Sequence, residues 1–255
     1  MNKIKEVAEN VAKEAGEYVL KHMGRLKEVS HKSGINDLVT DVDKGSEKII
    51  ISRIKNEFPE HSILAEESGE EDAGSVFRWV IDPLDGTTNY THSFPFFCVS
   101  IGVLYGKKVI AGVVYDPSRD ELFTAIDGSG AFLNGMPIKV SGAQAVKDSL
   151  IATGFAYNIQ TKKENVSYFG RMLQHAQAVR RAGSAALDLC YVACGIFDGF
   201  WEMGLHPWDT AAGQLMVTEA GGKVTNMSGE MFDIFQNSVV ATNASIHSEV
   251  IELLK

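Results

Sequence analysis

Two aspartates, Asp82 and Asp85, follow a run of large apolar residues in the stretch WVIDPLDGTTNY, and only a proline and a leucine separate them. Further acids stand at the ends of predicted strands and at predicted turns: Glu66, Glu67, Asp209, Asp41 and Asp43. Most of them adjoin apolar runs that we expect to be buried, and burying like charges together requires something positive to neutralise them. No cluster of His and Cys accompanies them. An all-oxygen ligand set favours a hard cation, Mg²⁺ before Mn²⁺ or Ca²⁺.

The bend at Pro83 allows Asp82 and Asp85 to point into one cavity, which the Leu84 carbonyl also faces. One carboxylate could then bridge two ions about 3.5–4 Å apart, the geometry for in-line attack on phosphorus. The glycine turn that follows, D-G-T-T, exposes backbone N–H groups where a helix could begin, and such groups form a natural cradle for phosphate. Thr87 adds a hydroxyl beside the metals.

Each of these features also has a purely structural interpretation. Asp-Pro and Asp-Gly are common turn dipeptides, so D-P-L-D-G alone could be an ordinary turn. Glu66-Glu67-Ser68 alone favours a solvated turn or a helix cap, and Asp209 alone favours the acidic start of a helix. The joint occurrence of the acids favours the metal site.

The bulk composition is that of a globular protein. The chain has 255 residues, of which 45% are hydrophobic and 22% charged, enough for one large domain or two modest ones. No segment reaches the roughly 18 uninterrupted apolar residues of a membrane span, and the first residues are charged and lack an apolar signal core, so we expect a cytoplasmic protein. The net charge of −9 argues against a broad nucleic-acid-binding face, although not against a small anionic substrate. The odd count of three cysteines (Cys98, Cys190 and Cys194) suits a reducing compartment.

The periodicity predicts two halves that meet near residues 141–148. The first half, 1–142, is predicted to be α+β, with helices at 4–23 and 42–57, then strands at 62–67, 76–82, 96–105, 107–116 and 121–126, and hairpin turns at Gly106-Lys107 and Asn134-Gly135. The second half, 143–255, is predicted to be α/β, with helices at 163–179, 185–194 and 208–220 and at the C-terminus, and strands at 149–155, 197–203, 222–226 and 238–242.

The sequence resembles the inositol monophosphatase family. The matching segments, in order, are D-L-V-T-D-V-D at 37–43, A-E-E-S at 65–68, W-V-I-D-P-L-D-G-T-T-N-Y at 79–90, W-E-M-G-L-H-P-W-D-T-A-A-G at 201–213 and E-A-G-G at 219–222. The resemblance covers essentially the whole chain, and the D-P-x-D-G-T-x-N-[FY] and W-D-x-A-[AG]-G pair is highly specific. It implies the layered αβαβα sandwich of the inositol monophosphatase and fructose-1,6-bisphosphatase type, usually a homodimer.

The resemblance also implies roles for the acids. Two or three Mg²⁺ ions would lie at the junction of the halves, held by Glu66, Asp82, the Leu84 carbonyl and Asp85, with Asp209 completing the second ion. Asp82 would bridge, and Glu66 would orient a metal-bound water. Thr87, paired with Asp43, would hydrogen-bond that nucleophilic water, so the implied catalytic residues are Glu66, Thr87 and Asp43. Glu67 matches no ligand of the family and is expected to be neighbouring support.

The implied substrate side draws on both halves. Asp85, Gly86 and Thr87 would face the phosphate; Gly183, Ser184 and Ala185 would line the sugar or inositol pocket; and Glu202 would accept substrate hydroxyls. Lys32 matches a mobile catalytic loop, with an ordinary surface lysine as the alternative. Arg181 either serves a second phosphate or forms a salt bridge at an interface between halves or subunits.

The function that this resemblance implies is a Mg²⁺-dependent phosphomonoesterase acting on inositol 1-phosphate or a related sugar or polyol phosphate through a metal-activated water. Fructose 1,6-bisphosphate and the 2′-phosphate of NADP are alternative substrates, and lithium sensitivity is expected. The compact loop between Glu67 and Trp79 argues against a dedicated bisphosphate nucleotidase. An alternative of another class is a non-catalytic RNA- or protein-binding partner. The presence of every expected acid and the negative net charge argue against it. No membrane and no nucleic acid are expected as partners.

Overall fold

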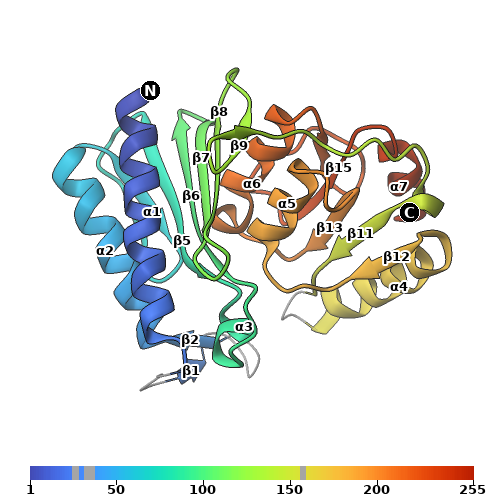
Figure 1. Cartoon of the computed structure of the whole chain (residues 1–255), viewed down its shortest axis with the longest axis horizontal. Coiled ribbons are helices and arrows are strands. Elements are labelled where there is room, and N and C mark those ends of the chain that lie inside the picture. The colour runs from blue at the N-terminus through green and yellow to red at the C-terminus, as the bar shows by residue number, and fades with distance from the viewer. Residues whose placement is uncertain (25–28, 32–37, 156–158) are drawn as a thin grey trace.

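The computed structural model describes residues 1–24, 29–31, 38–155 and 159–255 (Figure 1). These residues form an eight-stranded sheet, a five-stranded sheet and a two-stranded sheet, with helices packed around the two larger ones. None of the helices in these ranges is both long and apolar enough to cross a membrane.

The first half of the chain builds the eight-stranded sheet and the helices on its outer face. Its helices are α1 (Asn2–His22), α2 (Asp41–Glu57) and α3 (Thr87–Thr91). Its strands are β1 (Val29–His31), β2 (Leu38–Thr40), β3 (Ser62–Ala65), β4 (Gly69–Glu71), β5 (Phe77–Asp85), β6 (Cys98–Tyr105), β7 (Lys108–Asp116), β8 (Glu121–Ile126), β9 (Ala131–Leu133) and β10 (Met136–Pro137). The order across the large sheet is β10-β9-β8-β7-β6-β5-β3-β4, and β1 pairs only with β2.

The second half builds the five-stranded sheet, in the order β12-β11-β13-β15-β14. Its strands are β11 (Leu150–Thr153), β12 (Ala178–Arg180), β13 (Gly199–Met203), β14 (Lys223–Thr225) and β15 (Ser238–Thr242). Its helices are α4 (Ile159–His175), α5 (Ala185–Ala193), α6 (Pro207–Glu219) and α7 (His247–Leu253), with a short 3₁₀ turn at Val146–Asp148.

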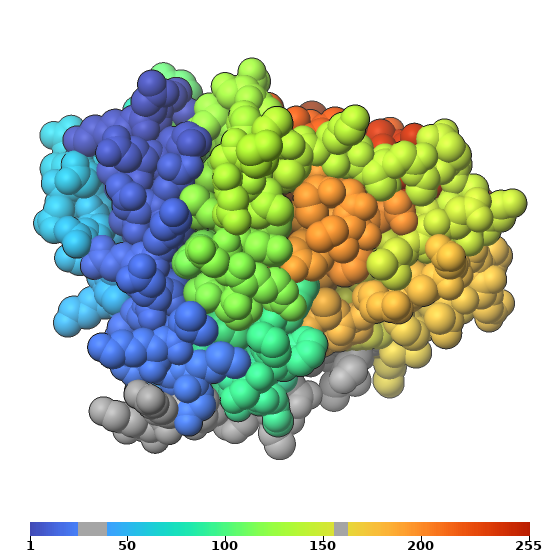
Figure 2. All heavy atoms as spheres, viewed as in Figure 1, coloured from blue at the N-terminus to red at the C-terminus, as the bar shows by residue number. Residues whose placement is uncertain are grey.

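These elements stack in five layers, which Figure 1 shows nearly edge-on. Helices α1 and α2 cover one face of the large sheet, and α5 and α6 lie between the two sheets. Helices α4 and α7 cover the far face of the second sheet. The space-filling view shows the blue α1 and the orange second half on opposite sides of the green strands (Figure 2). The predicted αβαβα sandwich is therefore confirmed.

The central strands of the large sheet are apolar on both faces because helices cover both. In β5, Trp79 and Ile81 pack toward α1 and α2, whereas Val80 packs toward α5 and α6, as the two-residue period of a strand requires. The cluster that contains Val80 also contains Phe200 of β13, so the two halves share one core. The division near residue 142 itself stays a prediction.

Helix α6 lies unusually close to the large sheet, on two facing glycines. Gly102 of β6 pairs with Gly112 of β7. A methyl group on Gly102 would lie 2.7 Å from the Ala211 Cβ, and one on Gly112 would lie 2.9 Å from the Ala212 carbonyl oxygen. Both distances are shorter than van der Waals contact, so these glycines are needed for the approach of the helix.

Local predictions had mixed outcomes. Both hairpin turns are confirmed: Tyr105 pairs with Lys108 and Leu133 with Met136. The helix expected at 163–179 was placed wrongly, because α4 runs from Ile159 to His175 and residues Ala178–Arg180 form β12. The cause is tertiary: Ala178 lies opposite Leu150, so these residues complete the edge of the second sheet rather than a further helical turn.

Candidate active site

The acids of the first half meet because β3 and β5 are parallel neighbours. Ala65, the last residue of β3, lies opposite Ile81, and the Glu66 N–H donates to the Ile81 carbonyl at 3.1 Å. Glu66 and Asp82 therefore lie next to each other at the carboxyl ends of β3 and β5. Their carboxyl groups are within hydrogen-bonding reach of each other.

The D-P-L-D segment is a β-bulge. Asp82 lies opposite Ser100 and Asp85 opposite Cys98, so Pro83 and Leu84 are extra residues on the β5 side of the ladder. The Leu84 N–H, freed from the ladder, donates to the Asp82 carboxylate at 3.0 Å. The bulge bends the strand, as the proline predicted, and brings both aspartates to one side.

Burial and neighbouring negative charges both disfavour the charged forms of Asp82 and Asp85. Burial raises the pKa of Asp82 well above its usual range, and the charges of Glu66, Asp85 and Asp209 raise it further. Burial, followed by the charge of Asp209 across the layers, raises the pKa of Asp85 to about 7. Asp209, in the first turn of α6, thus lies close enough to the acids of the first half to act on them electrostatically.

The donor set fits a hard cation. Among the described residues, no three His, Cys, Asp or Glu side chains already lie in the closed arrangement of a metal site. The four acids nonetheless share one region, where burial first and the neighbouring negative charges second raise the pKa values of Asp82 and Asp85, and a cation would relieve both effects. Carboxylate and carbonyl oxygens without thiol or imidazole match the preference of Mg²⁺.

Thr87 and Asp43 form the second predicted pair. Thr87 lies one residue after Gly86, whose φ of 94° suits glycine and starts the short α3. The Thr87 hydroxyl donates to the Asp43 carboxylate at 3.1 Å and lies equally far from the Leu84 carbonyl. Asp43 is fully buried, and its other oxygen accepts hydrogen bonds from the Thr40 N–H, at 2.8 Å, and the Thr40 hydroxyl in a capping box.

The predicted pocket segment at 183–185 starts α5 and holds Asp85. The Ser184 hydroxyl donates to the Asp85 carboxylate at 2.6 Å, and the Ala186 N–H donates to the same oxygen at 2.8 Å. Gly183 has a φ of 99°, and Ala185 is buried. The N-terminus of α5 therefore binds the Asp85 carboxylate directly.

Glu202 projects from β13 into the same region. It is 9% exposed, and burial together with the charge of Asp209 raises its pKa to about 8, against a lowering by Arg181. Arg181 is exposed, and its Nη1 atom would lie 2.8 Å from a methyl group placed on Gly183. The predicted residue Lys32 lies outside the residues that the structure describes.

Sequence reasoning missed three residues around the site. Asp188 of α5 is 1% exposed, its Oδ1 atom has no hydrogen-bond partner, and burial raises its pKa well above the usual range. A lone acid inside the apolar run A-A-L-D-L-C was the available signal. Asn89 donates from its side-chain amide to the Ala182 carbonyl at 2.9 Å, joining α3 to the pocket segment. The third residue, Glu47, reads in sequence as an ordinary charged residue of a solvated helix.

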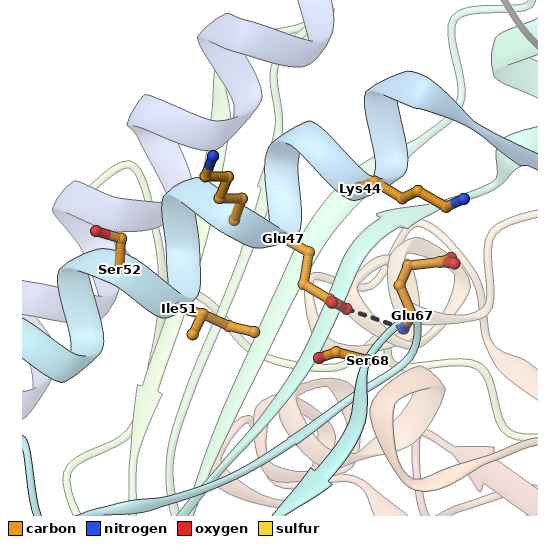
Figure 3. Close-up of a pocket in the computed structure, with 7 residues that line it drawn as sticks. Lys44, Glu47, Ile51, Ser52, Glu67 and Ser68 are labelled. Carbon is orange, nitrogen blue, oxygen red and sulfur yellow. Dashed lines mark hydrogen bonds between the residues drawn. The ribbon is translucent and has the colours of Figure 1, made fainter.

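Glu47 lines a surface cavity of about 460 Å³ between α2 and the turn after Glu66. Its carboxylate accepts a hydrogen bond from the Glu67 N–H, drawn as a dashed line in Figure 3. Glu67 points its side chain away from Glu47 in this view. Glu67 was expected to support the neighbouring site residues, and its backbone N–H group links their turn to α2.

Comparison with known proteins gives consistent results. The sequence model described as "Inositol monophosphatase family" matches residues 1–255. The chain is 45% identical to an inositol-1-monophosphatase of Synechocystis sp., over 98% of this chain and 88% of that protein. It is 43% identical to the Nus factor SuhB of Escherichia coli, over 96% of this chain and 93% of that protein. The crystal structure of the extragenic suppressor protein suhB from Bartonella henselae superposes with a TM-score of 0.95 at 40% identity, covering 99% and 98% of the two chains.

Proposed function

Because the chain belongs to the inositol monophosphatase family and is a phosphoric monoester hydrolase, we propose that it hydrolyses inositol 1-phosphate, or a related sugar or polyol phosphate, in a Mg²⁺-dependent reaction. The observation that carries this proposal is the convergence of four acids: burial raises the pKa of Asp82, and the charges of Glu66, Asp85 and Asp209 raise it further. A polyol phosphate combines the two features for which the site has groups, an anionic ester and hydroxyls.

Enzymes of this family are generally metal-dependent. Glu66, Asp82, the Leu84 carbonyl and Asp85 would hold Mg²⁺, with Asp209 completing a second ion, and a third ion near Glu66 is part of the proposal. Bound there, Mg²⁺ would neutralise the acids and the phosphate and lower the pKa of water. Asp85 is oriented for this role by the Ser184 hydroxyl and the Ala186 N–H.

Thr87 and Asp43 would position the attacking water. When the Thr87 hydroxyl donates its proton to Asp43, its lone pairs are left to accept a hydrogen bond from that water. Asp43 cannot turn away, because its second oxygen is held by Thr40. Glu66 would orient the same water, and the N–H groups of Gly86 and Thr87 would bind the phosphate.

The leaving group would lie against the second half. Gly183, Ser184 and Ala185 would line its pocket, and the Glu202 carboxylate would accept hydrogen bonds from two hydroxyls. Arg181 would lie at the pocket rim, where its charge already acts on Glu202 and on the buried Asp188. Its part in this proposal is contact with a second anionic group of the substrate, and a salt bridge at an interface stays the alternative.

The proposal is tested by measuring phosphate release from a panel of substrates while Mg²⁺ is titrated. The panel comprises inositol 1-phosphate, fructose 1,6-bisphosphate, NADP and 3′-phosphonucleotides, at one enzyme concentration. We expect the highest kcat/KM on inositol 1-phosphate or another monophosphorylated polyol, no turnover in excess chelator, and inhibition by Li⁺. Equal rates on all substrates would contradict a dedicated polyol phosphatase. Preference for fructose 1,6-bisphosphate or NADP would select those alternative functions on the same site.

A second candidate function follows from the 43% identity with the Nus factor SuhB of Escherichia coli. The chain could act as a protein- or RNA-binding partner through its surface, independently of catalysis. A catalytically inactive Asp85→Asn variant that restores function in cells lacking the protein would support this role. A requirement for catalysis in the same assay would reject it. We also propose a homodimer, for which a mass of twice 27.8 kDa by light scattering is the test.

A further inference from the structure

The Glu202 carboxyl group lies directly against the backbone of Gly154, the residue after β11. A methyl group on Gly154 would lie 2.0 and 2.1 Å from the two carboxylate oxygens and 2.2 Å from the carboxyl carbon. Atoms do not approach this closely without bonding, so any side chain at position 154 would displace the whole carboxyl group. Glu202 occupies the place that a side chain at position 154 would take.

Backbone conformation does not explain this glycine. The glycines with a positive φ, such as Gly183, do not include Gly154, so an alanine would adopt its φ without strain. No other group lies nearer to the missing methyl than the Glu202 carboxyl. The missing side chain, rather than backbone freedom, is what the position requires.

Asn165 of α4 fixes the backbone on both sides of this contact. Asn165 is fully buried, and its side-chain amide donates to the Gly154 carbonyl. Its side-chain oxygen accepts a hydrogen bond of 2.7 Å from the indole N–H of Trp201, the neighbour of Glu202. Thr153 closes the network by donating to the Trp201 carbonyl at 2.7 Å. The buried side-chain amide of Asn165 thus links Gly154, which leaves space for the carboxyl group, to Trp201, the neighbour of Glu202.

The Glu202 carboxyl group is largely buried and lies within the electrostatic influence of Asp209 and Arg181. Among the described residues, none donates a hydrogen bond from its side chain to this carboxyl group in the structure, although the group is 9% exposed. A buried carboxylate without donors is costly, so a bound molecule that brings hydroxyl donors would gain from this placement. The position of the Glu202 carboxyl group therefore decides which ligands can donate hydrogen bonds to it.

We propose that Gly154 and Asn165 are the positioning residues that set substrate specificity, by placing the Glu202 carboxylate where it accepts hydrogen bonds from the hydroxyls of a polyol phosphate. This inference rests on the proposed phosphatase function and names the groups that give it its polyol selectivity. Gly154 follows β11 and Asn165 lies in α4, outside the segments that carry the proposed metal ligands, so we expect their effect to be confined to substrates with hydroxyls.

The test compares inositol 1-phosphate with p-nitrophenyl phosphate, which has no hydroxyls. For Gly154→Ala we expect KM for inositol 1-phosphate to rise about tenfold or more, the loss of about one hydrogen bond to a charged group. We expect the kcat/KM of Gly154→Ala for p-nitrophenyl phosphate to stay within about twofold of the wild-type value. The matched control is Gly170→Ala, because Gly170 has open space around the added methyl group and lies within α4. An unchanged ratio of the two kcat/KM values, or equal losses on both substrates, would overturn the inference.

A double-mutant cycle with Glu202→Asp makes the test independent of a general loss of stability. Aspartate is shorter by one methylene and relieves the contact, so the two substitutions together should cost less than the sum of their separate effects. Additive effects would show that the contact does not matter. Asn165→Asp loses the donor to Gly154, and we expect the same selective rise in KM. If the wild-type protein hydrolyses neither substrate with Mg²⁺, the proposed function fails; if it hydrolyses both and Gly154→Ala changes nothing, only this inference fails.

Discussion

The Glu47 carboxylate accepts a hydrogen bond of 2.9 Å from the backbone N–H of Glu67 and so ties α2 to the turn that carries Glu66. Ser46 and Asp43, on the same face of α2, also form hydrogen bonds to segments that carry site residues. The Ser46 hydroxyl donates to the Pro83 carbonyl at 2.8 Å, and Asp43 accepts from the Thr87 hydroxyl. Positions 43, 46 and 47 lie on one helical face. The first turns of one helix therefore hold all three segments of the first half that carry site residues.

This arrangement predicts that Glu47 controls metal affinity without touching a metal. Glu47→Ala leaves the Glu67 N–H without its partner and frees the turn, so the Mg²⁺ concentration for half-maximal activity should rise about tenfold. Glu47→Gln keeps an acceptor oxygen and should stay within about threefold of the wild type. Ser52→Ala, in the same surface cavity, is the matched control. Identical Mg²⁺ titrations for Glu47→Ala and the control would contradict the prediction.

Asp85→Asn should abolish most activity and leave the fold intact. The amide oxygen can still accept from Ser184 and Ala186, but the negative charge proposed to bind Mg²⁺ is lost. We expect kcat to fall about a thousandfold, equivalent to several kcal/mol. The metal-free variant should unfold at the same temperature as the wild type or higher, because a carboxyl group with a raised pKa is removed. Full activity, or wild-type activity in excess chelator, would refute the metal-site assignment.

Thr87→Val tests the water-positioning pair at nearly constant volume. The valine has no hydroxyl to bridge Asp43 and the water, so kcat should fall about 10²–10⁴-fold, the typical contribution of a positioned proton acceptor. Thr87→Ser restores the hydroxyl and should recover most of the rate. Steady-state kinetics at saturating Mg²⁺ measures both. Equal losses in the two variants would assign Thr87 a packing role.

The raised pKa of Glu202 predicts a pH-dependent instability of the metal-free protein. The ordinary pKa of this side chain is 4.5 and its folded value is about 8. Below pH 4.5 the group is protonated in both states and changes nothing. Between pH 4.5 and 8 the folded state retains a proton that the unfolded state has lost, so the free energy of unfolding decreases as pH rises.

Glu202→Gln should remove this contribution. In chelator at pH 8, the variant should be more stable than the wild type by about 1–3 kcal/mol, while at pH 4 the two should agree. Denaturant unfolding at the two pH values measures the difference. If the difference in free energy of unfolding between Glu202→Gln and the wild type becomes less favourable from pH 4 to pH 8, the raised pKa of Glu202 does not cause the pH dependence.

Local patterns were sufficient to predict an α+β half, an α/β half and the acids at the strand ends of the first half, whereas the αβαβα layering was implied by the family resemblance. The apolar run before Asp82 predicts a buried strand, and Pro83 predicts the bend that the structure shows as a β-bulge. Residues Ala178–Arg180 were misassigned because their partner, β11, lies far away in sequence and no local pattern records that pairing.

Contacts between the halves were accessible only through the family resemblance. Ser184 and Asp85 are 99 residues apart, and spacing gives no reason to join them. The role of Glu47 was missed for a different reason. An acid on a helix next to lysines has the appearance of a solvated residue, and only the turn packed above it makes the side chain 5% exposed.

The paired glycines Gly102 and Gly112 link the candidate site to the hydrophobic core, because they pack against α6. Asp209 stands in the first turn of that helix, and Ala211 and Ala212 rest on Gly102 and Gly112. A single added carbon atom in the middle of the large sheet would lift the helix and shift the carboxylate it carries. Changes at these two inconspicuous positions would consequently displace the Asp209 carboxylate as well as strain the core.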